Sequence, residues 1–254
     1  MIRFFFVILF IILFLICSIP LLLIETFIGS FNPALKDRIS QKTIQWAFGV
    51  CLNISGVHTH YIGTDNIPKE GAFLYVANHK SYFDIPLTYL RFPRPTGYVA
   101  KIEMEKYLLL SDWMRNIHCL FLDRENVKEG MKMILKGIEE IKSGVSICIF
   151  PEGTRCSDPD SFLPFHEGSF RMAEKAKCPI IPVSITNSRA LWENHFPAIR
   201  GAHVIIEFGK PIVLENLSKE ERKFLGAYVQ KEIKKMYDKN KAILQSASKN
   251  LSNL

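Results

Sequence analysis

The chain has 254 residues, of which 48% are hydrophobic, and its formal net charge at pH 7 is +7. The basic residues are scattered, without a zinc-finger, RNP-like or aromatic-interleaved basic motif, which argues against nucleic acid as a partner. The six cysteines show no C-x-x-C pair and no regular spacing, so neither a disulfide framework nor a structural zinc site is indicated. An anionic membrane surface or a phosphate-bearing substrate is the more economical partner for this charge.

The first 30 residues are strongly apolar. No charged residue occurs from Phe4 to Ile24, and a helix of that length would be roughly 30 Å long, enough to cross the core of a bilayer. We therefore predict that residues 1–30 are a membrane segment. Pro20 could kink it, so that it dips into the interface as a hairpin instead of spanning. A cleaved signal peptide is the competing interpretation, but the apolar core exceeds the usual ~7 to 15 residues and no small-x-small cleavage site follows it.

The region after this segment is basic and helical. If the segment spans, Lys36, Arg38 and Lys42 outweigh the lone Arg3 before it, which favours a catalytic domain on the cytoplasmic face of the membrane. Residues 31–56 are predicted to be a helical connector, with the helix over residues 33–55.

From residue 57 onwards, strand-like and helix-like segments alternate. Strands are predicted at 57–62, 73–77, 98–101, 120–123, 145–150, 180–185 and 203–208. Helices are predicted at 104–116, between the capping residue Asn126 and Gly144, and at 218–242. This alternation implies an α/β domain with a mostly parallel sheet flanked by helices, and we assign residues 57–254 to one catalytic domain.

The most informative stretch is Asn78-His79-Lys80-Ser81-Tyr82-Phe83-Asp84. Five residues apart in a regular strand or helix, His79 and Asp84 could not meet. A strand that ends near Asn78 and turns sharply into a helix near Pro86 does let them meet, because proline is tolerated in the first helical turn. Asp84 could then accept a hydrogen bond from one imidazole nitrogen while the other faces a substrate. A surface histidine and a helix-capping aspartate are the alternative interpretation.

A second stretch, Phe150-Pro151-Glu152-Gly153-Thr154-Arg155, directly follows a predicted strand. Ligands bind at strand ends in α/β sheets, and Gly153 would let the backbone approach an anion closely. Arg155 could clamp a phosphate through two parallel hydrogen bonds, with Thr154 adding a hydroxyl. Taken alone, Glu152, Gly153, Thr154 and Arg155 are ordinary loop residues, and an ordinary surface turn is the favoured interpretation.

The order of the motifs resembles the glycerolipid acyltransferases typified by the 1-acyl-glycerol-3-phosphate acyltransferases. The resemblance covers roughly Val57 to Pro211. It rests on four blocks, namely Asn78 to Asp84, Phe121-Leu122-Asp123-Arg124, Phe150 to Arg155, and Ile181-Pro182-Val183. The first and third blocks are specific together, whereas the second and fourth are weak alone.

The resemblance implies an acyltransferase of phospholipid biosynthesis. Such an enzyme moves an acyl group from acyl-CoA or acyl carrier protein to the sn-2 hydroxyl of 1-acyl-glycerol-3-phosphate (lysophosphatidic acid), giving phosphatidic acid. By position, His79 would be the general base and Asp84 the carboxylate that orients it. Transfer would be direct, without an acyl-enzyme, a metal ion or a cofactor beyond the acyl donor, and membrane lipid would surround the substrates.

The resemblance also assigns binding residues. Arg124, Gly153 and Arg155 match residues that hold the acceptor's phosphate, and Glu152 matches one that shapes the loop and contacts the acceptor. Lys101, in Val-Ala-Lys-Ile-Glu, matches a recurring basic position.

The fourth block and one departure from the pattern bear on the two substrates. Pro182 matches a proline near the acyl-donor site. His166 and Glu167 stand where basic residues are common, which could mean another acceptor head group, such as that of a lysophospholipid or a lyso-aminolipid.

Other interpretations compete with this one. His58 and His60 alternate on a strand, but no carboxylate or cysteine follows at metal-ligand spacing. Ser81 lacks a G-x-S-x-G elbow, and Cys148 lies in an apolar strand that favours a core position. A hydrolase that uses His79 to activate water, on a thioester or a phosphoester, and a membrane-tethered lipid-binding module without turnover are the alternative functions.

Overall fold

The computed structural model describes residues 1–252, with side chains described as far as residue 247. The predicted catalytic range of 57–254 therefore includes two residues, 253 and 254, that lie outside the described part. The α-helices are α1 (Ile2–Cys17), α2 (Ile19–Phe31), α3 (Pro33–Ser55), α4 (Asp84–Tyr89), α5 (Leu110–Asn116), α6 (Val127–Ser143), α7 (Arg171–Ala176), α8 (Lys219–Lys223) and α9 (Leu225–Ser252). The strands are β1 (His58–Ile62), β2 (Leu74–Ala77), β3 (Thr96–Lys101), β4 (Leu120–Leu122), β5 (Ser146–Ile149), β6 (Ile180–Thr186) and β7 (His203–Phe208).

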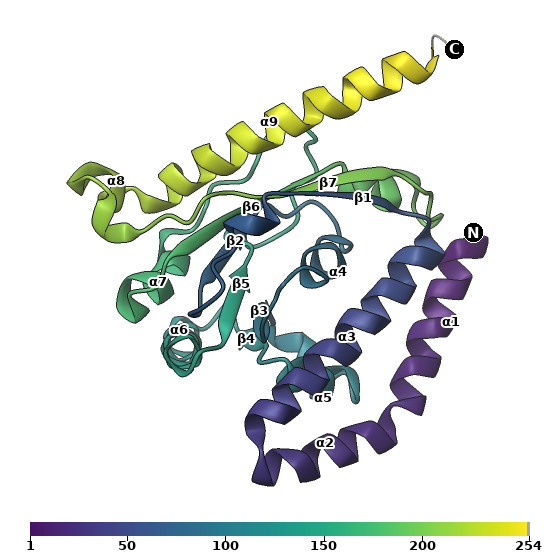
Figure 1. Ribbon diagram of the computed structural model, residues 1–254, viewed down its shortest axis with the longest axis vertical. Helices are drawn as coiled ribbons and strands as arrows, with labels where there is room; N and C mark the ends of the chain where they lie inside the picture. Colours follow the sequence, from purple (N-terminus) through teal and green to yellow (C-terminus); the bar gives the residue numbers. More distant parts are fainter. Residues whose placement is uncertain (253–254) are drawn as a thin grey trace.

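The seven strands form one sheet in the order β1-β7-β6-β2-β5-β3-β4 (Figure 1). The five strands from β6 to β4 are mutually parallel, whereas β7 runs antiparallel to β6, and β1 runs parallel to β7. This confirms the predicted α/β class with a mostly parallel sheet. The carboxyl ends of β2, β5, β3 and β4 therefore lie along one edge of the sheet, where α/β proteins place their ligand sites.

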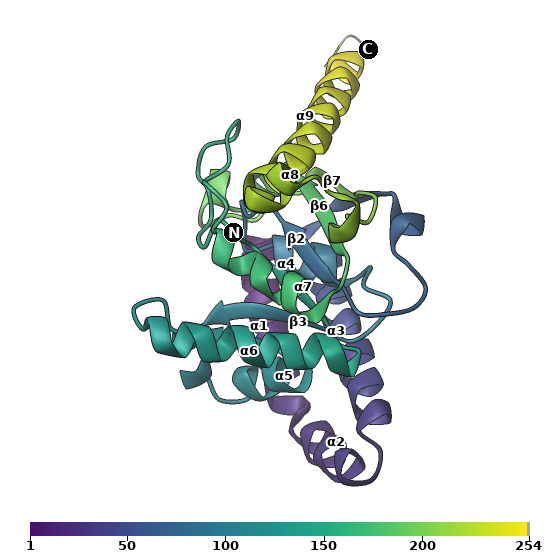
Figure 2. The same cartoon turned by 90° about the vertical axis from the view of Figure 1, so that its left-hand side faces the viewer.

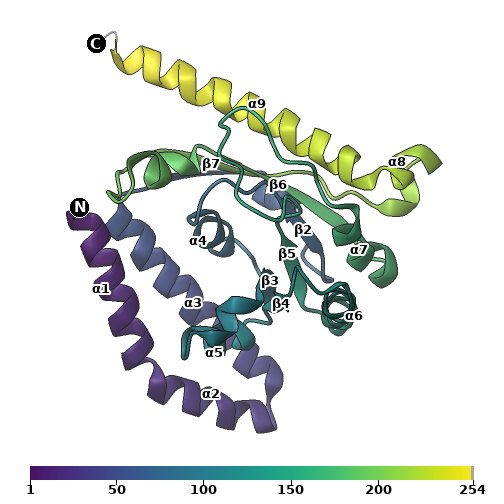
Figure 3. The same ribbon diagram turned by 180° about the vertical axis from the view of Figure 1, so that it is seen from behind.

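Both faces of the sheet are covered, which is why β2 is apolar at every position. Leu74 and Val76 point into one core, with α6, α7 and α9, and Tyr75 and Ala77 point into the other, with α3, α4 and α5. Figures 2 and 3 show α6, α7 and α9 on one side of the sheet and the N-terminal helices on the other.

The N-terminal segment is not the continuous helix of Phe4 to Ile24 that the sequence suggested. The helix ends at Cys17 and restarts at Ile19, with Pro20 in the first turn of α2, where its missing N–H is no loss. Among residues 1–252, no single helix combines the length and hydropathy needed to cross a bilayer. Helices α1 and α2 meet that requirement only as a pair, and the pair is bent by 49°.

The N-terminal helices pack on the rest of the chain. Val7 and Leu22 belong to the same hydrophobic cluster as Tyr75 of the central strand. In the buried interface, Glu25 of α2 accepts hydrogen bonds from Ser40 of α3 and Asn116 of α5. These contacts fix α2 against two other helices, while the division of the chain at residues 30 and 56 stays a prediction.

The helix predicted over residues 104–116 is wrong in its first half. A short 3-10 turn covers Ile102–Lys106, and α5 begins only at Leu110, because Leu109 has a φ of +62° that ends any regular helix. The predicted tail helix is also divided, at Phe224, between α8 and α9.

The remaining elements agree with the sequence. All seven predicted strands are present within two residues of their predicted ends. Helix α3 has the predicted bounds, and Asn126 caps α6 by accepting hydrogen bonds from the N–H groups of Lys128 and Glu129.

His118 joins two helices through a pair of carboxylates, which predicts a pH-dependent stability. Its Nε2 lies 3.1 Å from Asp37 of α3, and its Nδ1 lies 2.9 Å from Glu140 of α6. Burial alone would lower the pKa of the imidazole, but the two carboxylates outweigh burial and raise it from 6.5 to about 9. Because the folded state favours the protonated ring, this stabilisation is complete below pH 6.5 and is lost as the pH rises through about 9.

We expect His118→Gln to lower the free energy of unfolding by at most about 3 kcal/mol at pH 6, and by much less above pH 9. Urea unfolding of both proteins across this range measures the difference. A difference that does not change with pH would contradict the assignment of this effect to the charge of His118.

Candidate active site

His79 and Asp84 meet at the turn between β2 and α4. The imidazole Nδ1 lies 2.9 Å from the Asp84 Oδ2. The carboxylate is fully buried, and the same oxygen accepts hydrogen bonds from the backbone N–H groups of Lys80 (2.6 Å) and Ser81 (2.7 Å). Three donors therefore fix Asp84, and Asp84 fixes the ring. The predicted meeting of these two side chains is confirmed in geometry.

The His79 ring is held but remains accessible. Its side chain is 18% exposed, and the Phe150 ring stacks on it at a centroid distance of 4.1 Å. The His79 carbonyl accepts a hydrogen bond from the Cys156 N–H at 2.8 Å. With the proton on Nδ1 and directed at Asp84, Nε2 carries a lone pair and is available as a base.

Glu152 links the two loops of the site. One carboxylate oxygen accepts the His79 N–H (2.7 Å), and the other accepts the Leu163 N–H (2.8 Å). The side chain is buried, and burial raises its pKa, although these N–H donors act in the opposite direction. Glu152 thus shapes the loop as expected, and its contact with an acceptor stays a prediction.

The turn after β5 has the conformation that its glycine allows. Gly153 has a φ of +70°, and its N–H donates to the Phe150 carbonyl at 3.0 Å. A Cβ at this position would lie 3.3 Å from the His166 ring, so that imidazole lies beside the turn. Glu167 points elsewhere and accepts a hydrogen bond from the Gly226 N–H.

Arg155 is placed by two residues of different segments. Its guanidinium lies over the Tyr82 ring, 3.5 Å from the centroid, and its Nη1 is 3.7 Å from the Glu193 carboxylate. Because Tyr82 belongs to the His79 loop, these contacts bring the cation to the same edge of the sheet as the base. The role of Arg155 in holding an anionic substrate stays a prediction.

Glu193 is a site residue that sequence reasoning missed. It lies in a 3-10 turn (Glu193–His195), and its carboxylate accepts hydrogen bonds from the Ser81 hydroxyl (2.7 Å) and the Tyr82 N–H (2.9 Å). More than 100 residues separate it from the His79 loop, and no local pattern marks it. Ser81 donates to this carboxylate instead of to a histidine, so it does not have the geometry of an activated nucleophile.

The other predicted residues lie on neighbouring strand ends, in the turn after β5 and within the sheet. Lys101 ends β3 and Arg124 follows β4, and both are exposed. They are two and three strands from β2, which corresponds to about 10 Å and about 14 Å across the sheet. Thr154 is exposed in the turn, whereas Pro182 is buried in the middle of β6, opposite Val76. Their predicted roles in binding stay predictions.

Lys80 is buried directly beside the base, with 2% of its surface exposed. Its ammonium donates to the backbone carbonyls of Asp158 and Ser161, and it lies over the rings of Phe162 (5.1 Å) and Tyr237 (5.7 Å). Lysine is rarely buried unless it is paired, and these contacts join the loop after β5 to the His79 loop, together with Glu152 and the Cys156 N–H.

We expect Lys80→Met to lower the free energy of unfolding by about 1 to 3 kcal/mol, because two part-buried hydrogen bonds from a charged donor are lost. Urea unfolding tests this prediction. Lys132→Met is the matched control, since Lys132 is exposed on α6 and its ion pair among the described side chains is with Glu129, so its loss should cost less than about 0.5 kcal/mol. Equal effects of the two substitutions would contradict the role assigned to Lys80.

The alternative sites have no reactive geometry. Cys148 is fully buried in β5, and burial raises the pKa of its thiol well above the ordinary value, which disfavours the thiolate. His58 and His60 are exposed at the edge of the sheet, where both rings stack on His203. No group of three ligand-type side chains that could hold a metal ion occurs within residues 1–252.

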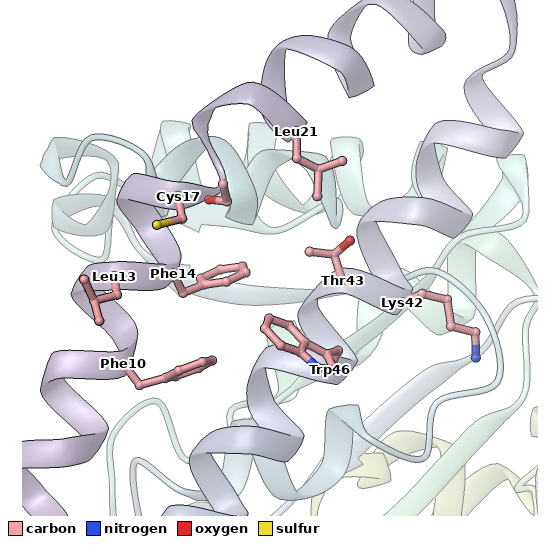
Figure 4. A pocket seen from close by; sticks show the side chains of 9 residues that line it. Phe10, Leu13, Phe14, Cys17, Leu21, Lys42, Thr43 and Trp46 are labelled. Atoms are coloured by element: carbon pink, nitrogen blue, oxygen red, sulfur yellow. The ribbon is translucent and has the colours of Figure 1, made fainter.

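A separate apolar cavity of about 730 Å³ lies between α1, α2 and α3 (Figure 4). Phe10 and Phe14 of α1 face Trp46 of α3 across it, and Lys42 lies at its side. None of the residues that line it belongs to the His79 site.

Sequence comparison places the chain among known enzymes. The family profile described as Acyltransferase matches residues 58–186. A protein from Saccharomyces cerevisiae named 1-acyl-sn-glycerol-3-phosphate acyltransferase is 30% identical over 210 residues, which cover 80% of this chain and 68% of the yeast protein. A protein from Mycoplasma pneumoniae named probable 1-acyl-sn-glycerol-3-phosphate acyltransferase is 29% identical over 212 residues, covering 79% of each chain.

Structure comparison agrees with the sequence. The crystal structure of the 1-acyl-sn-glycerophosphate (LPA) acyltransferase PlsC from Thermotoga maritima matches with a TM-score of 0.82 and 25% identity, covering 95% of both chains. The profile match covers about half of the chain and includes both the His79 and the Arg155 loops. This chain therefore belongs to the acyltransferase family that contains the 1-acyl-sn-glycerol-3-phosphate acyltransferases.

Proposed function

We propose that this protein transfers a fatty acyl group from an acyl thioester, acyl-CoA or acyl carrier protein, to the sn-2 hydroxyl of 1-acyl-glycerol-3-phosphate, giving phosphatidic acid for phospholipid biosynthesis. The observation that carries the proposal is the position of Arg155, which lies on the ring of Tyr82 in the same loop as the His79–Asp84 pair. The base His79 and the cation Arg155 lie at the same edge of the sheet, which suits an acceptor that carries both a hydroxyl and a phosphate. The names of the relatives support this choice of acceptor.

The reaction needs one proton to move twice. His79 Nε2 takes the proton of the acceptor hydroxyl as its oxygen attacks the thioester carbonyl, and Asp84 stabilises the imidazolium that forms. The tetrahedral intermediate collapses, the carbon–sulfur bond breaks, and the leaving thiolate receives this proton from Nε2, which restores the neutral imidazole. Because a thioester is already activated, a base worth about 10² to 10⁴ in rate, together with the positioning of two bound substrates, is sufficient.

The acceptor's phosphate would lie at the turn after β5. Gly153 opens the backbone there, and Arg155 and Thr154 supply a cation and a hydroxyl. Arg124 and Lys101, on the neighbouring strand ends, would add long-range attraction for a doubly charged phosphate. Pro182 is proposed to contribute to the acyl-donor side from within β6.

We also propose that α1 and α2 bind the bilayer and place the site at its cytoplasmic face. Large apolar side chains such as Leu13, Leu23 and Phe27 are exposed along these helices. Contact of so much apolar surface with water is unfavourable, whereas contact with lipid is not. The bent arrangement suits insertion into one leaflet as well as a broken span.

Removing the Arg155 guanidinium should weaken the binding of the acceptor and leave the binding of the acyl donor nearly unchanged. We expect Arg155→Ala to raise the KM for 1-acyl-glycerol-3-phosphate by about 10- to 100-fold, the range for losing a hydrogen bond to a charged group, while the KM for the acyl thioester stays nearly unchanged. Steady-state kinetics with each substrate varied in turn measures both constants. A rise in the thioester KM alone would assign Arg155 to the donor instead.

The function itself is tested with a panel of acceptors. The purified protein receives one labelled acyl-CoA together with 1-acyl-glycerol-3-phosphate or with a lysophospholipid that carries a larger head group. We expect the highest kcat/KM for the phosphate monoester. Preference for another lysolipid would keep the mechanism and overturn the acceptor, in line with His166 and Glu167 at positions that are commonly basic. Thioester consumption without any acceptor would indicate a hydrolase.

A further inference from the structure

Three aromatic side chains form a continuous strip beside the active site, with exposed rings at its two ends and a half-buried Trp192 between them. Tyr82 of the His79 loop packs on Trp192 (5.4 Å between centroids), and Trp192 packs on Phe196 (5.5 Å). Tyr82 is 57% exposed and Phe196 is 70% exposed. Phe196 and Trp192 lie outside the part of the chain that matches the family profile, so the match does not explain them.

One end of the aromatic strip reaches the substrate site. The Arg155 guanidinium lies on the Tyr82 ring, as described above. A phosphate bound by Arg155 would therefore lie next to the strip, and the rest of a lysolipid bound there would have an apolar surface beside it.

The other end of the aromatic strip reaches α1. Trp192 stacks on Phe4 in the first turn of α1, with centroids 5.8 Å apart and planes 24° apart. The neighbouring side chains of that turn, Ile2 and Phe5, are exposed. In Figures 1 and 3 the first turn of α1 lies at the end of the molecule where β1 and β7 meet the N-terminal helices. The strip thus continues the exposed apolar surface of α1 up to the guanidinium of Arg155.

We propose that the aromatic strip of Tyr82, Trp192 and Phe196 inserts into the membrane interface and is the side through which a membrane-resident acceptor reaches His79. This inference rests on the proposed function, because it takes the acceptor to be a lysolipid in a bilayer. Tryptophan and tyrosine prefer the membrane interface, where the ring is buried and the polar tip stays wet. Arg155, at the inner end of the strip, complements an anionic head group.

The three tryptophans of the chain make the proposal directly measurable. Trp113 is buried, Trp46 is exposed beside the cavity between α1 and α3, and Trp192 belongs to the strip. Two variants of the full chain, Trp46→Phe and Trp192→Phe, therefore each keep one tryptophan that is not fully buried, half-buried Trp192 or exposed Trp46, together with the same buried Trp113. Each is mixed with phosphatidylcholine–phosphatidylglycerol vesicles whose acyl chains are brominated, and with unbrominated vesicles as reference.

We expect brominated vesicles to quench Trp192 in the Trp46→Phe variant. The quenching should fall to the Trp113 background when Trp192 is also replaced by phenylalanine. Quenching of Trp46 without quenching of Trp192 would overturn the inference and leave the membrane association of α1 to α3 intact. Quenching of neither would overturn both, while acyl transfer to a dispersed short-chain acceptor would still report on the proposed enzyme.

A kinetic test separates membrane access from catalysis. Phe196→Ser should lower kcat/KM by about three- to tenfold for an acceptor embedded in vesicles, because one aromatic side chain no longer contacts the membrane interface. The kcat/KM for the short-chain acceptor should stay unchanged. Phe224→Ser is the matched control, because Phe224 is 52% exposed between α8 and α9 and should change neither value. In Figure 1, α8 lies at the opposite end of the molecule from the first turn of α1, which the strip contacts. Equal losses on both acceptors in Phe196→Ser would overturn the role in access.

Discussion

Replacing His79 with alanine is expected to lower kcat by about 10² to 10⁴, the contribution of a positioned general base. The imidazole is the group that joins the Asp84 carboxylate to the substrate side of the turn, and alanine leaves no proton acceptor there. The KM values should change little, because the residues proposed to bind the phosphate remain. Single-turnover transfer from a labelled acyl-CoA measures the effect on the chemical step.

The control for this substitution is His58→Ala. His58 is an exposed imidazole on β1 with no part in the His79 site, so its loss should leave kcat unchanged. The His79→Ala protein should also unfold at nearly the urea concentration of the wild type. Full activity of His79→Ala would rule out general-base catalysis by this residue, and a loss that tracks unfolding would assign it a structural role.

The second large effect is expected for Asp84→Asn, which keeps the shape of the side chain and removes its charge. Asp84 is fully buried and contacts His79, so it acts through the ring. Without the carboxylate, the imidazolium that forms during attack is no longer stabilised by a negative charge, although an asparagine oxygen in the place of Oδ2 would still accept the proton on Nδ1. We expect kcat to fall by about 10² to 10⁴, with both KM values nearly unchanged.

Stability separates this role from a purely structural one. The carboxylate also accepts the N–H groups of Lys80 and Ser81, and the asparagine oxygen can still accept them. A loss of activity in a protein that unfolds like the wild type supports the catalytic assignment. An Asp84→Asn protein that keeps its kcat and changes only KM would contradict it.

Much of the fold could be predicted because its elements are locally encoded. β2 and β5 are short apolar runs that end at turn residues, and the Asn126 cap marks the start of α6 before any tertiary contact is considered. The predictions that were wrong concern helix ends that depend on the backbone conformation of single residues. The positive φ of Leu109 delays the start of α5. Leucine rarely adopts a positive φ, so nothing in the sequence predicts this conformation.

The site shows the same division. His79, Asp84, Gly153 and Arg155 come from two local motifs, and the sheet brings these motifs together because β2 and β5 are neighbours. Glu193 could not be predicted, because it reaches the site through a contact that spans more than 100 residues.

Burial was equally hard to predict. In the sequence, Lys80 reads as an ordinary loop lysine. The carbonyls that bury its charge come from Asp158 and Ser161, on a loop that only the tertiary structure places over it.

The measurement that tests the central claim most directly is acyl transfer from a labelled acyl-CoA to 1-acyl-glycerol-3-phosphate by the purified protein in vesicles. It is run beside His79→Ala and with the acceptor omitted. The proposed function predicts labelled phosphatidic acid with the wild type, a loss of at least about 10² with His79→Ala, and no thioester consumption without acceptor. Thioester consumption that is independent of acceptor, or phosphatidic acid formed equally by His79→Ala, would contradict it.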